Sequence, residues 1–318
     1  MQSYNFVNLK TRLDKPEVQR VWSLSIGYAT PEKLARVVER CRGNAARKLW
    51  GVTDGADVLG VAEYYIRDDG TLYICNIAVT EQRRGQGIGK FMIAALHEKY
   101  GLPITLETDD DAVDFYRKCG FEAQPFMHAQ YGIRRWDCRL CRLPRAFYAQ
   151  DVLAAAPALL GKLLCRRLDG ETVLRRRVTE AEAYRGEDDT ACHASRGRTP
   201  RNAVLYRAGG VSYVYLCYGM HNLLNIVTGV EGEPQGVLIR GVEGAHGPGR
   251  VTKAMSVDRA LNAEDVCASG RLWLEDDGFR PARIETAPRV GIAYASAEDR
   301  ARLWRFFTAP QKNGEPGI

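Results

Sequence analysis

Residues 133–148, IRRWDCRLCRLPRAFY, constrain the fold more than any other segment because they divide the chain in two. An apolar strand pattern gives way here to a basic, proline-containing connection, and the helix-like DVLAAAPALLGKLL follows. A chain of 318 residues is long enough for each part to bury a core of its own. We therefore predict one domain over residues 1–138 and a second over residues 143–318, with the break near Arg139 to Pro144.

The first domain alternates between strand and helix patterns from Lys48 to Glu122. Apolar and polar residues alternate with the period of strands at KLWGVT, VLGVAEYYI, LYICNIAVT and ITLET. IGKFMIAALHEKY and the shorter AVDFYRKCG have the spacing of helices. This order predicts a mixed sheet with helices, that is, an α/β domain.

A turn of sequence QRRGQGIGK connects the LYICNIAVT strand to the helix after it. Arg84, Gly87 and Gly89 form an RxxGxG pattern, in which small residues let backbone amides approach an anion at the helix N-terminus. Such a turn can bind a pyrophosphate. A purely structural glycine turn explains these residues equally well when they are taken alone.

The strand, this turn, the AALHEKYG helix and DAVDFYRKCGFE together resemble the GNAT-type N-acetyltransferases over most of residues 1–136. The resemblance implies acetyl-coenzyme A as the cofactor, an amine of unknown identity as the acceptor, and Tyr116 as the general acid near the thiolate. In that family the turn binds the pyrophosphate and the preceding strand pairs with the pantetheine arm. The matching residues here are Ile77, Val79, Arg84, Gly85, Gln86, Gly87, Ile88, Gly89 and Lys90.

Two strand carboxylates, Glu63 and Glu107, could each deprotonate an amine. Carboxylates on strands are more often solvated edge charges, so we assign no catalytic base from the sequence. The acidic triplet Asp109 to Asp111 is better explained as a helix cap, with favourable charge in front of AVDFYRKC.

The second domain brings acidic and aromatic side chains together in two strand patterns. In VTEAEAY, alternation places Glu180, Glu182 and Tyr184 on one face. In VSYVYLCYGMHNLLNI, it places Tyr213 and Tyr215 on one face. A carboxylate beside aromatic rings suits an enzyme that flips a damaged base out of DNA.

Each of these residue types also has an ordinary explanation. A tyrosine in an alternating strand is usually part of the core, and Glu180 and Glu182 would then form an exposed pair. A single His193 is more often a loop residue bonded to backbone groups than a ligand. CRLC, with Cys138 and Cys141, lacks a second pair nearby, so two free thiols explain it better than a zinc site.

Seven blocks in order make this half of the chain resemble the methylpurine DNA glycosylases, also called alkyladenine or 3-methyladenine DNA glycosylases, from about Leu143 to Pro310. The resemblance implies a predominantly β domain with flanking helices, so the whole chain is expected to be α/β plus α+β. The blocks are FY (147–148), LLGKLL (159–164), TEAEAYRGEDDTACHASRGRTPRN (179–202), YVYLCYGMHNLLNIV (213–227), VLIRGVE (237–243), GPGRVTKAM (247–255) and PRVGIAYA (288–295).

The same resemblance implies a role for individual residues. Glu182 matches the glutamate that activates water, and Arg240 matches the residue that helps hold this water. Tyr218 matches the side chain that enters the minor groove and fills the space left by the flipped base. The residues that match the base pocket are Tyr184, His193, Tyr215 and Asn225.

The three blocks that carry these residues contain no lysine, which argues against an amine nucleophile and a Schiff-base intermediate. The resemblance therefore implies a monofunctional enzyme that displaces the base with water and needs no metal or redox cofactor. Its expected substrates are alkylated purines of the 3-methyladenine type in double-stranded DNA, with hypoxanthine as a further candidate.

The net charge of +6 permits an anionic partner without proving one. Arg196, Arg198 and Arg201 could neutralise phosphates, whereas a run such as Arg175 to Arg177 is more often a solvated strand face. The chain has no apolar run of membrane-spanning length and no secretory signal pattern at its N-terminus. We expect a bacterial cytoplasmic protein that joins the nucleoid when it acts.

Two other functions compete with the glycosylase reading. Acetylation could be the main activity, with the second domain serving as a DNA- or lesion-binding module. The second domain could also bind lesions without cutting. Glu182 argues against a pure binding protein, because such a protein has no need of an acid beside a polyanion.

Overall fold

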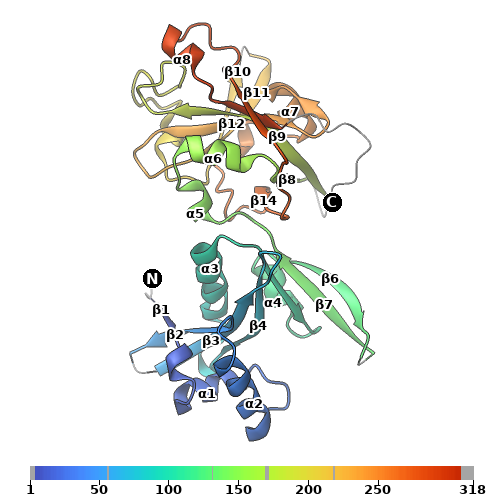
Figure 1. Ribbon diagram of the computed structural model, residues 1–318. Helices are drawn as coiled ribbons and strands as arrows, with labels where there is room; N and C mark the ends of the chain where they lie inside the picture. Colours follow the sequence, from blue (N-terminus) through green and yellow to red (C-terminus); the bar gives the residue numbers. More distant parts are fainter. Residues whose placement is uncertain (1–3, 56, 131, 169–171, 218, 309–318) are drawn as a thin grey trace. The chain divides into compact units, whose positions relative to one another are not determined.

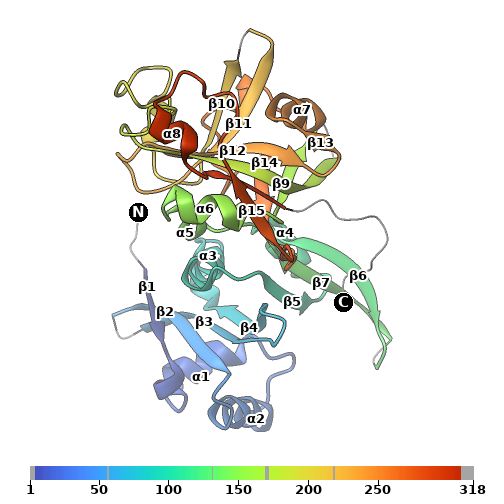
Figure 2. The same cartoon turned by 45° about the horizontal axis from the view of Figure 1, so that its top comes forward.

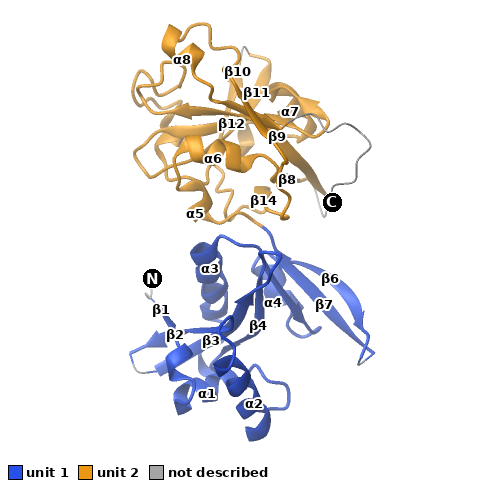
Figure 3. Cartoon of the chain, in the orientation of Figure 1, with its two compact units in different colours: residues 1–141 blue, residues 142–318 orange. Residues whose placement is uncertain are grey.

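The computed structural model describes residues 4–55, 57–130, 132–168, 172–217 and 219–308. It divides into two compact units, Met1–Cys141 and Arg142–Ile318 (Figure 3). Each unit has its own buried apolar core. None of the helices in the described ranges is long and apolar enough to cross a membrane.

The first unit is a seven-stranded sheet in the order β1-β2-β3-β4-β5-β7-β6, with four helices (Figure 1). Two short 3-10 turns, η1 (Lys10–Arg12) and η2 (Glu81–Arg83), complete it. Its strands are β1 (Asn5–Asn8), β2 (Lys48–Asp54), β3 (Asp57–Ile66), β4 (Leu72–Val79), β5 (Ile104–Thr108), β6 (Glu122–His128) and β7 (Ile133–Leu140). Its helices are α1 (Pro16–Ser23), α2 (Pro31–Arg42), α3 (Ile88–Tyr100) and α4 (Val113–Lys118).

Alternation along the central strand β3 decides which helices cover each face of this sheet. Val61 packs with Trp22 of α1 on one face, and Ala62 packs with Met92 of α3 on the other. Gly60 permits the close approach of α3, because a Cβ there would lie 2.9 Å from the Met92 methyl carbon. The mixed sheet predicted from the sequence is confirmed, and helices cover both of its faces.

Strand β4 has two irregularities that matter for the site below. It pairs with β5 only at Leu72 and Tyr73, so the rest of β4 diverges from β5. In its pairing with β3, Asn76 lies opposite Glu63 and Ile74 opposite Tyr64, which leaves the intervening residue as a β-bulge. Backbone groups beyond Tyr73 therefore have no partner on β5.

The second unit is a nine-stranded sheet with four helices, and its main path is β10-β11-β12-β9-β16-β15. β8 pairs with β9 and β14, while β13 pairs with β12. The strands are β8 (Leu163–Arg167), β9 (Val173–Arg185), β10 (Ser212–Cys217), β11 (His221–Val227), β12 (Gln235–Val242), β13 (Ala245–His246), β14 (Leu272–Glu275), β15 (Ile284–Ala287) and β16 (Arg305–Thr308). The helices are α5 (Arg145–Tyr148), α6 (Val152–Leu159), α7 (Pro248–Ala254) and α8 (Ala297–Ala301), with 3-10 turns η3 (Ala203–Tyr206) and η4 (Arg259–Leu261).

Helix α6 lies against β9 and β12 in both ribbon views (Figures 1 and 2). Its Ala155 and Leu159 join Ala181 of β9 and Ile239 of β12 in one core. The predominantly β domain with flanking helices is thus confirmed, and β9 is the central strand that both α6 and the site residues share.

The helix predicted at DVLAAAPALLGKLL is too long. It ends at Leu159, two residues after Pro157, and Leu163 already belongs to β8. Pro157 cannot donate a helical hydrogen bond, and Gly161 turns the chain with a φ of +86°. Leu159, Leu160 and Leu164 are buried on both sides of the change from helix to strand, so the apolar run gave no sign of it.

The acidic triplet before α4 acts only partly as predicted. Asp109 accepts a hydrogen bond from the backbone N–H of Ala112 at the start of the helix (3.2 Å). Asp110 instead binds the Arg134 guanidinium (2.9 Å) and the Trp136 indole (2.7 Å) on β7. Its charge therefore ties the β6–β7 hairpin to the α4 turn.

Candidate functional sites

The carboxylate of Glu182 lies at the centre of the second unit. β9 places it between β12 and β16, opposite Leu238 on one side and Arg305 on the other. The side chain is fully buried. One carboxylate oxygen accepts from the backbone N–H of Val290 (2.8 Å), and the other accepts from the Tyr184 hydroxyl (3.0 Å).

Arg240 supplies the positive charge beside this carboxylate. A register shift in the β12–β9 pairing between Ile239 and Gly241 leaves Arg240 unpaired with β9. Its Nη1 lies 3.5 Å from Glu182 Oε1 and its Nε lies 3.0 Å from Glu180 Oε1. The Glu180 and Glu182 side chains are 15% and 0% exposed, so the exposed-pair explanation is wrong.

Burial is the largest influence on Glu182 and raises the pKa of its carboxyl. The Arg240 charge, the Val290 N–H and the Tyr184 hydroxyl lower this pKa and partly offset the effect of burial. A carboxylate with a raised pKa is a stronger base than a solvated one. The surroundings of Glu182 therefore suit proton removal from a water molecule.

An aromatic cavity of about 40 Å³ adjoins this carboxylate through Tyr184. The His193 ring lies 4.5 Å from the Tyr215 ring, and its Nδ1 lies 3.0 Å from the Tyr213 hydroxyl. The Asn225 amide donates to the Tyr213 carbonyl (3.2 Å). The structure thus brings together the four residues predicted to form the base pocket, along with Ala191, Cys192, Leu205, Tyr213, Gly236 and Tyr294.

The cavity is small for its expected ligand. Its volume is close to the share of one or two water molecules, which is less than a purine needs. His193 and Tyr294 are exposed, whereas Asn225 is buried. Desolvation, followed by the nearby Arg201 charge, lowers the pKa of His193, so its imidazole is neutral at pH 7.

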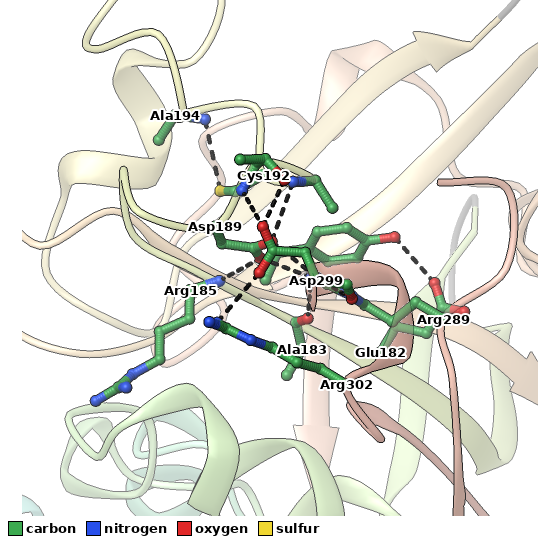
Figure 4. Close-up of polar contacts among 12 residues, drawn as sticks. Glu182, Ala183, Arg185, Asp189, Cys192, Ala194, Arg289, Asp299 and Arg302 are labelled. Carbon is green, nitrogen blue, oxygen red and sulfur yellow. Dashed lines mark hydrogen bonds and ion pairs between the residues drawn. The ribbon is translucent and has the colours of Figure 1, made fainter. Parts of the chain in front are cut away.

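A buried ion pair holds these residues in position (Figure 4). Arg289 and Asp189 are both fully buried in their side chains and bind in bidentate fashion, at 2.6 and 2.8 Å. Asp189 also accepts from the backbone N–H groups of Arg185 and Ala191, each at 3.1 Å. The Arg289 guanidinium lies 4.8 Å from the Tyr184 ring centroid. The pair therefore joins β9, the His193 loop and the segment whose Val290 N–H binds Glu182.

A second cavity, of about 480 Å³, lies in the first unit where β4 diverges from β5. Of the residues predicted to bind the cofactor, all except Gln86 line it, and Tyr116 lines it as well. The Gln86 side chain instead donates to the Gln82 carbonyl (3.3 Å). Leu24, Ala78, Arg83 and Phe115 also line the cavity and were missed from the sequence.

The turn before α3 has the backbone that close approach to an anion requires. Gly85 and Gly87 have φ angles of +74° and +82°, and Gly87 is the N-cap of the 13-residue helix. In the part of the chain that the structure describes, no side chain caps the first amides of α3, so these amides can donate to a ligand. Burial raises the pKa of Tyr116 well above its ordinary value, so the phenol stays protonated at neutral pH.

The expectation that Glu63 is a solvated edge charge is wrong. Glu63 is fully buried because β3 is a central strand, with β2 and β4 on either side. Its carboxylate binds Arg47 Nη1 and Asn76 Nδ2, each at 2.6 Å. Glu107 is exposed on β5, as expected.

The comparisons with known proteins decide the family. The family model described as methylpurine-DNA glycosylase (MPG) matches residues 146–312, which is more than half of the chain. This chain belongs to the methylpurine-DNA glycosylase family. Its second unit is accordingly a base-excision repair glycosylase, which hydrolyses N-glycosidic bonds.

Curated relatives agree with this assignment. One from Methanocella arvoryzae is 47% identical over 185 residues, covering 52% of this chain and 91% of its own length. One from Psychrobacter cryohalolentis is 40% identical over 179 residues, covering 47% and 84%. Both are named 3-methyladenine DNA glycosylase, as a provisional assignment.

The first unit gave separate matches. The model of the GNAT acetyltransferase domain matches residues 45–123, so the glycosylase is fused to a GNAT domain. A solved GNAT acetyltransferase from Elizabethkingia anophelis, with acetyl-CoA bound, is 15% identical over 44% of this chain and 99% of its own, with a TM-score of 0.34.

Other residues predicted for the glycosylase differ in how the structure places them. Tyr218, the predicted intercalating residue, lies outside the described residues. Arg175 and Arg177 bind Glu275 (3.2 Å) and Asp277 (2.8 Å), and Arg176 donates to the Glu243 carbonyl (2.9 Å). All three arginines are therefore engaged in contacts within the second unit. Arg196, Arg198 and Arg201 are exposed near the base pocket loop and remain the candidates for phosphate contacts.

The Asp189–Arg289 pair was not predicted from the sequence, although Asp189 lies in the block of residues 179–202 and Arg289 in that of residues 288–295. Two charges separated by 100 positions give no sign that they meet. The only available signal was an arginine within an otherwise apolar block, since a buried arginine requires a partner. Among the described residues, no group of three His, Cys, Asp or Glu side chains is arranged to hold a metal ion.

Proposed function

We propose that the glycosylase unit removes alkylated purines of the 3-methyladenine type from double-stranded DNA by direct displacement with water. The observation that carries this proposal is the fully buried Glu182 carboxylate, held by Val290, Tyr184 and Arg240 beside an aromatic cavity. The carboxylate takes a proton from water, the water oxygen bonds to the anomeric carbon, and the purine leaves with the electrons of the glycosidic bond. Glu182 also stabilises the positive charge that develops on the sugar.

In this proposal the pocket selects the base by its electronic character. Tyr184, His193 and Tyr215 stack on the flipped purine, and aromatic faces attract a cationic alkylated ring more strongly than a neutral one. Asn225 excludes the guanine amino group. An alkylated purine with a positive charge is already a good leaving group, so the enzyme needs mainly to supply the water. Hypoxanthine, which is neutral, is expected to react more slowly.

The direct test is single-turnover release of base from duplexes that contain one 3-methyladenine analogue or one hypoxanthine, with alkali added to reveal abasic sites. Release of the base with an intact strand before alkali supports a monofunctional glycosylase. Tight lesion binding without release would make the second unit a recognition module, and acetylation would become the leading function.

The pH dependence of base release is a first prediction. Only the ionised carboxylate can accept a proton, so the rate is expected to rise with pH through the pKa of Glu182, which burial raises. In Arg240→Gln this pKa loses a lowering influence, and the acid limb is expected to move to still higher pH. Single-turnover rates from pH 4 to 8 measure the acid limb of the wild type and that of the variant. Arg207→Gln, an exposed control, should keep the wild-type limb. An Arg240→Gln limb at lower pH would contradict this account.

We propose that the GNAT unit uses acetyl-coenzyme A and acetylates an amine. The backbone amides after Gly87 hold the pyrophosphate, with Arg84 and Lys90 beside it, and the open edge of β4 at Ile77 to Val79 pairs with the pantetheine arm. The cavity of about 480 Å³ leaves room for this arm, and the protonated Tyr116 phenol can donate to the leaving thiolate.

Gly87→Val is expected to weaken acetyl-coenzyme A binding at least about tenfold, because a branched Cβ blocks the approach of phosphate to the backbone. Gly101→Val is the matched control. Gly101 ends the same helix at φ +63°, and neither glycine has a heavy atom within 4 Å of its missing Cβ. Both variants bear a similar strain of roughly 1–2 kcal/mol. Isothermal titration calorimetry should show a loss for Gly87→Val alone, and equal losses would refute the assignment.

A further inference from the structure

The buried carboxylate of Glu63 has no part in the chemistry proposed so far. It is fully buried on the central strand β3, where it binds Arg47 Nη1 and Asn76 Nδ2 at 2.6 Å and lies 3.9 Å from Arg40 Nη2. Removing charges from water is costly, and apolar residues of similar size often serve stability as well. Stability alone therefore gives no reason for charged residues at this place.

The β-bulge of β4 turns two polar side chains toward Glu63. Cys75 and Asn76 together lie opposite this single residue, and Cys75 Sγ lies 3.2 Å from Arg47 Nη1. Bulges often re-aim side chains beside active sites. Asn76 immediately precedes Ile77, the first β4 residue of the cofactor cavity. The Glu63 cluster therefore adjoins the cofactor cavity along β4.

The side chains around the bulge differ in charge from one end to the other. At one end Arg40 and Arg47 oppose the single carboxylate of Glu63, and the Arg40 side chain is 50% exposed. At the other end Glu107 is exposed on β5 and forms no ion pair among the described residues, and the Arg67 guanidinium lies 4.0 Å from the Tyr73 ring centroid. The Tyr65 and Tyr73 rings lie between them, with centroids 5.5 Å apart.

A buried hydroxyl on the same face also lacks a partner. Thr105 of β5 pairs with Tyr73 of β4, so the two side chains share a face of the sheet. Thr105 is 5% exposed, and its hydroxyl has no hydrogen-bond partner among the described residues. Buried polar groups are normally paired, so this one points to a ligand.

We propose that this surface is the acceptor site and that it takes a primary amine bearing a carboxylate or phosphate group. The inference rests on the proposed acetyl transfer. Arg40 binds the anionic group, because Glu63 already neutralises Arg47 and leaves one net positive charge. Glu107 faces the ammonium at the opposite end. A molecule with separated positive and negative charges fits this arrangement better than a polyamine.

The reaction balances without a further reagent. The ammonium loses a proton to the Glu107 carboxylate, which passes it to solvent, and the amine nitrogen attacks the thioester carbonyl. A carbon–nitrogen bond forms, the nitrogen gives its second proton to solvent, and the carbon–sulfur bond breaks. The sulfur takes the Tyr116 proton and leaves as free coenzyme A, and Tyr116 is reprotonated from solvent.

The test uses the full-length chain and two matched pairs of amines, L-lysine with cadaverine and phosphoethanolamine with ethanolamine. Acetyl-coenzyme A binding is measured first by calorimetry, and acetylation is then followed by thiol release and product mass. We expect at least one amine with an anionic group to react with a kcat/KM about tenfold or more above the partner that lacks this group. Arg40→Ala should raise the KM of that amine about tenfold or more, with the acetyl-coenzyme A affinity unchanged.

Arg36→Ala, one turn earlier on the exposed side of α2, is the matched control and should behave as wild type. Arg40→Lys should restore part of the affinity for the anionic amine. If acetyl-coenzyme A does not bind, the proposed acetyl transfer fails and this inference fails with it. If it binds but neither anionic amine is preferred, or if Arg40→Ala slows both members of a pair equally, the inference alone is overturned.

Discussion

Replacing Glu182 by glutamine is expected to slow base release by about 10²- to 10⁴-fold, because the amide cannot accept a proton from water. Glutamine has nearly the same size and can still accept from Val290 or Tyr184 through its carbonyl oxygen. Folding and lesion binding should therefore survive the change. Single-turnover rates on a duplex with one alkylated purine measure the loss, and a binding assay on the same duplex separates recognition from chemistry.

Glu285→Gln provides the control, since Glu285 is a partly exposed carboxylate on β15 of the same sheet. It should leave the rate within about twofold of wild type, as expected of a surface pair. If Glu182→Gln retains more than about a tenth of the wild-type rate, another group must activate the water.

Arg289→Met is expected to destabilise the glycosylase unit by about 3–5 kcal/mol. The change leaves the Asp189 carboxylate fully buried without its bidentate partner, and it removes the cation from beside the Tyr184 ring. Urea unfolding followed by hydrogen exchange and mass spectrometry measures the free energy of unfolding separately for peptides of each unit. The peptides of residues 142–308 should lose protection, and those of the first unit should keep it.

Arg283→Met is the matched control, because Arg283 forms an ion pair with Glu285 at 75% side-chain exposure. Its loss should cost no more than about 1 kcal/mol. Adding Asp189→Asn to Arg289→Met should recover part of the stability, because neither residue of the former pair then carries a buried charge. A cost below about 1 kcal/mol for Arg289→Met alone would show that solvent reaches Asp189 in the folded protein.

Much of the fold could be predicted because alternation and capping are local properties. The helix IGKFMIAALHEKY begins at Ile88 and ends at Tyr100 as predicted, since Gly87 and Gly101 stop it at both ends. The helix before Gly161 was predicted too long because its apolar run continues into a buried strand. Alternation placed Glu63 on a predicted strand, but it does not distinguish a central strand from an edge strand. The burial of Glu63 was therefore not predicted.

The candidate site divides in the same way. Glu182 and Tyr184 are two residues apart on one strand, so their contact follows from the strand period. The contact between Glu182 and Arg240 depends on the pairing of β9 with β12 and on a register shift, which a single sequence does not encode in any local pattern. The residues of the Asp189–Arg289 pair are still farther apart in the sequence. Their contact depends on the tertiary arrangement of the segments that carry them.

The small aromatic cavity has a consequence for fidelity. With room for only one or two waters, it is smaller than a purine, so in the proposed reaction a base enters only as the lining side chains move apart. Opening the cavity costs the same free energy for every purine. Only a base that stacks strongly on the aromatic rings offsets this cost by binding. In the proposed reaction, undamaged bases would then be rejected before they reach Glu182 and its water. Discrimination would then begin when the cavity opens, ahead of the difference in leaving-group quality that slows the release of hypoxanthine.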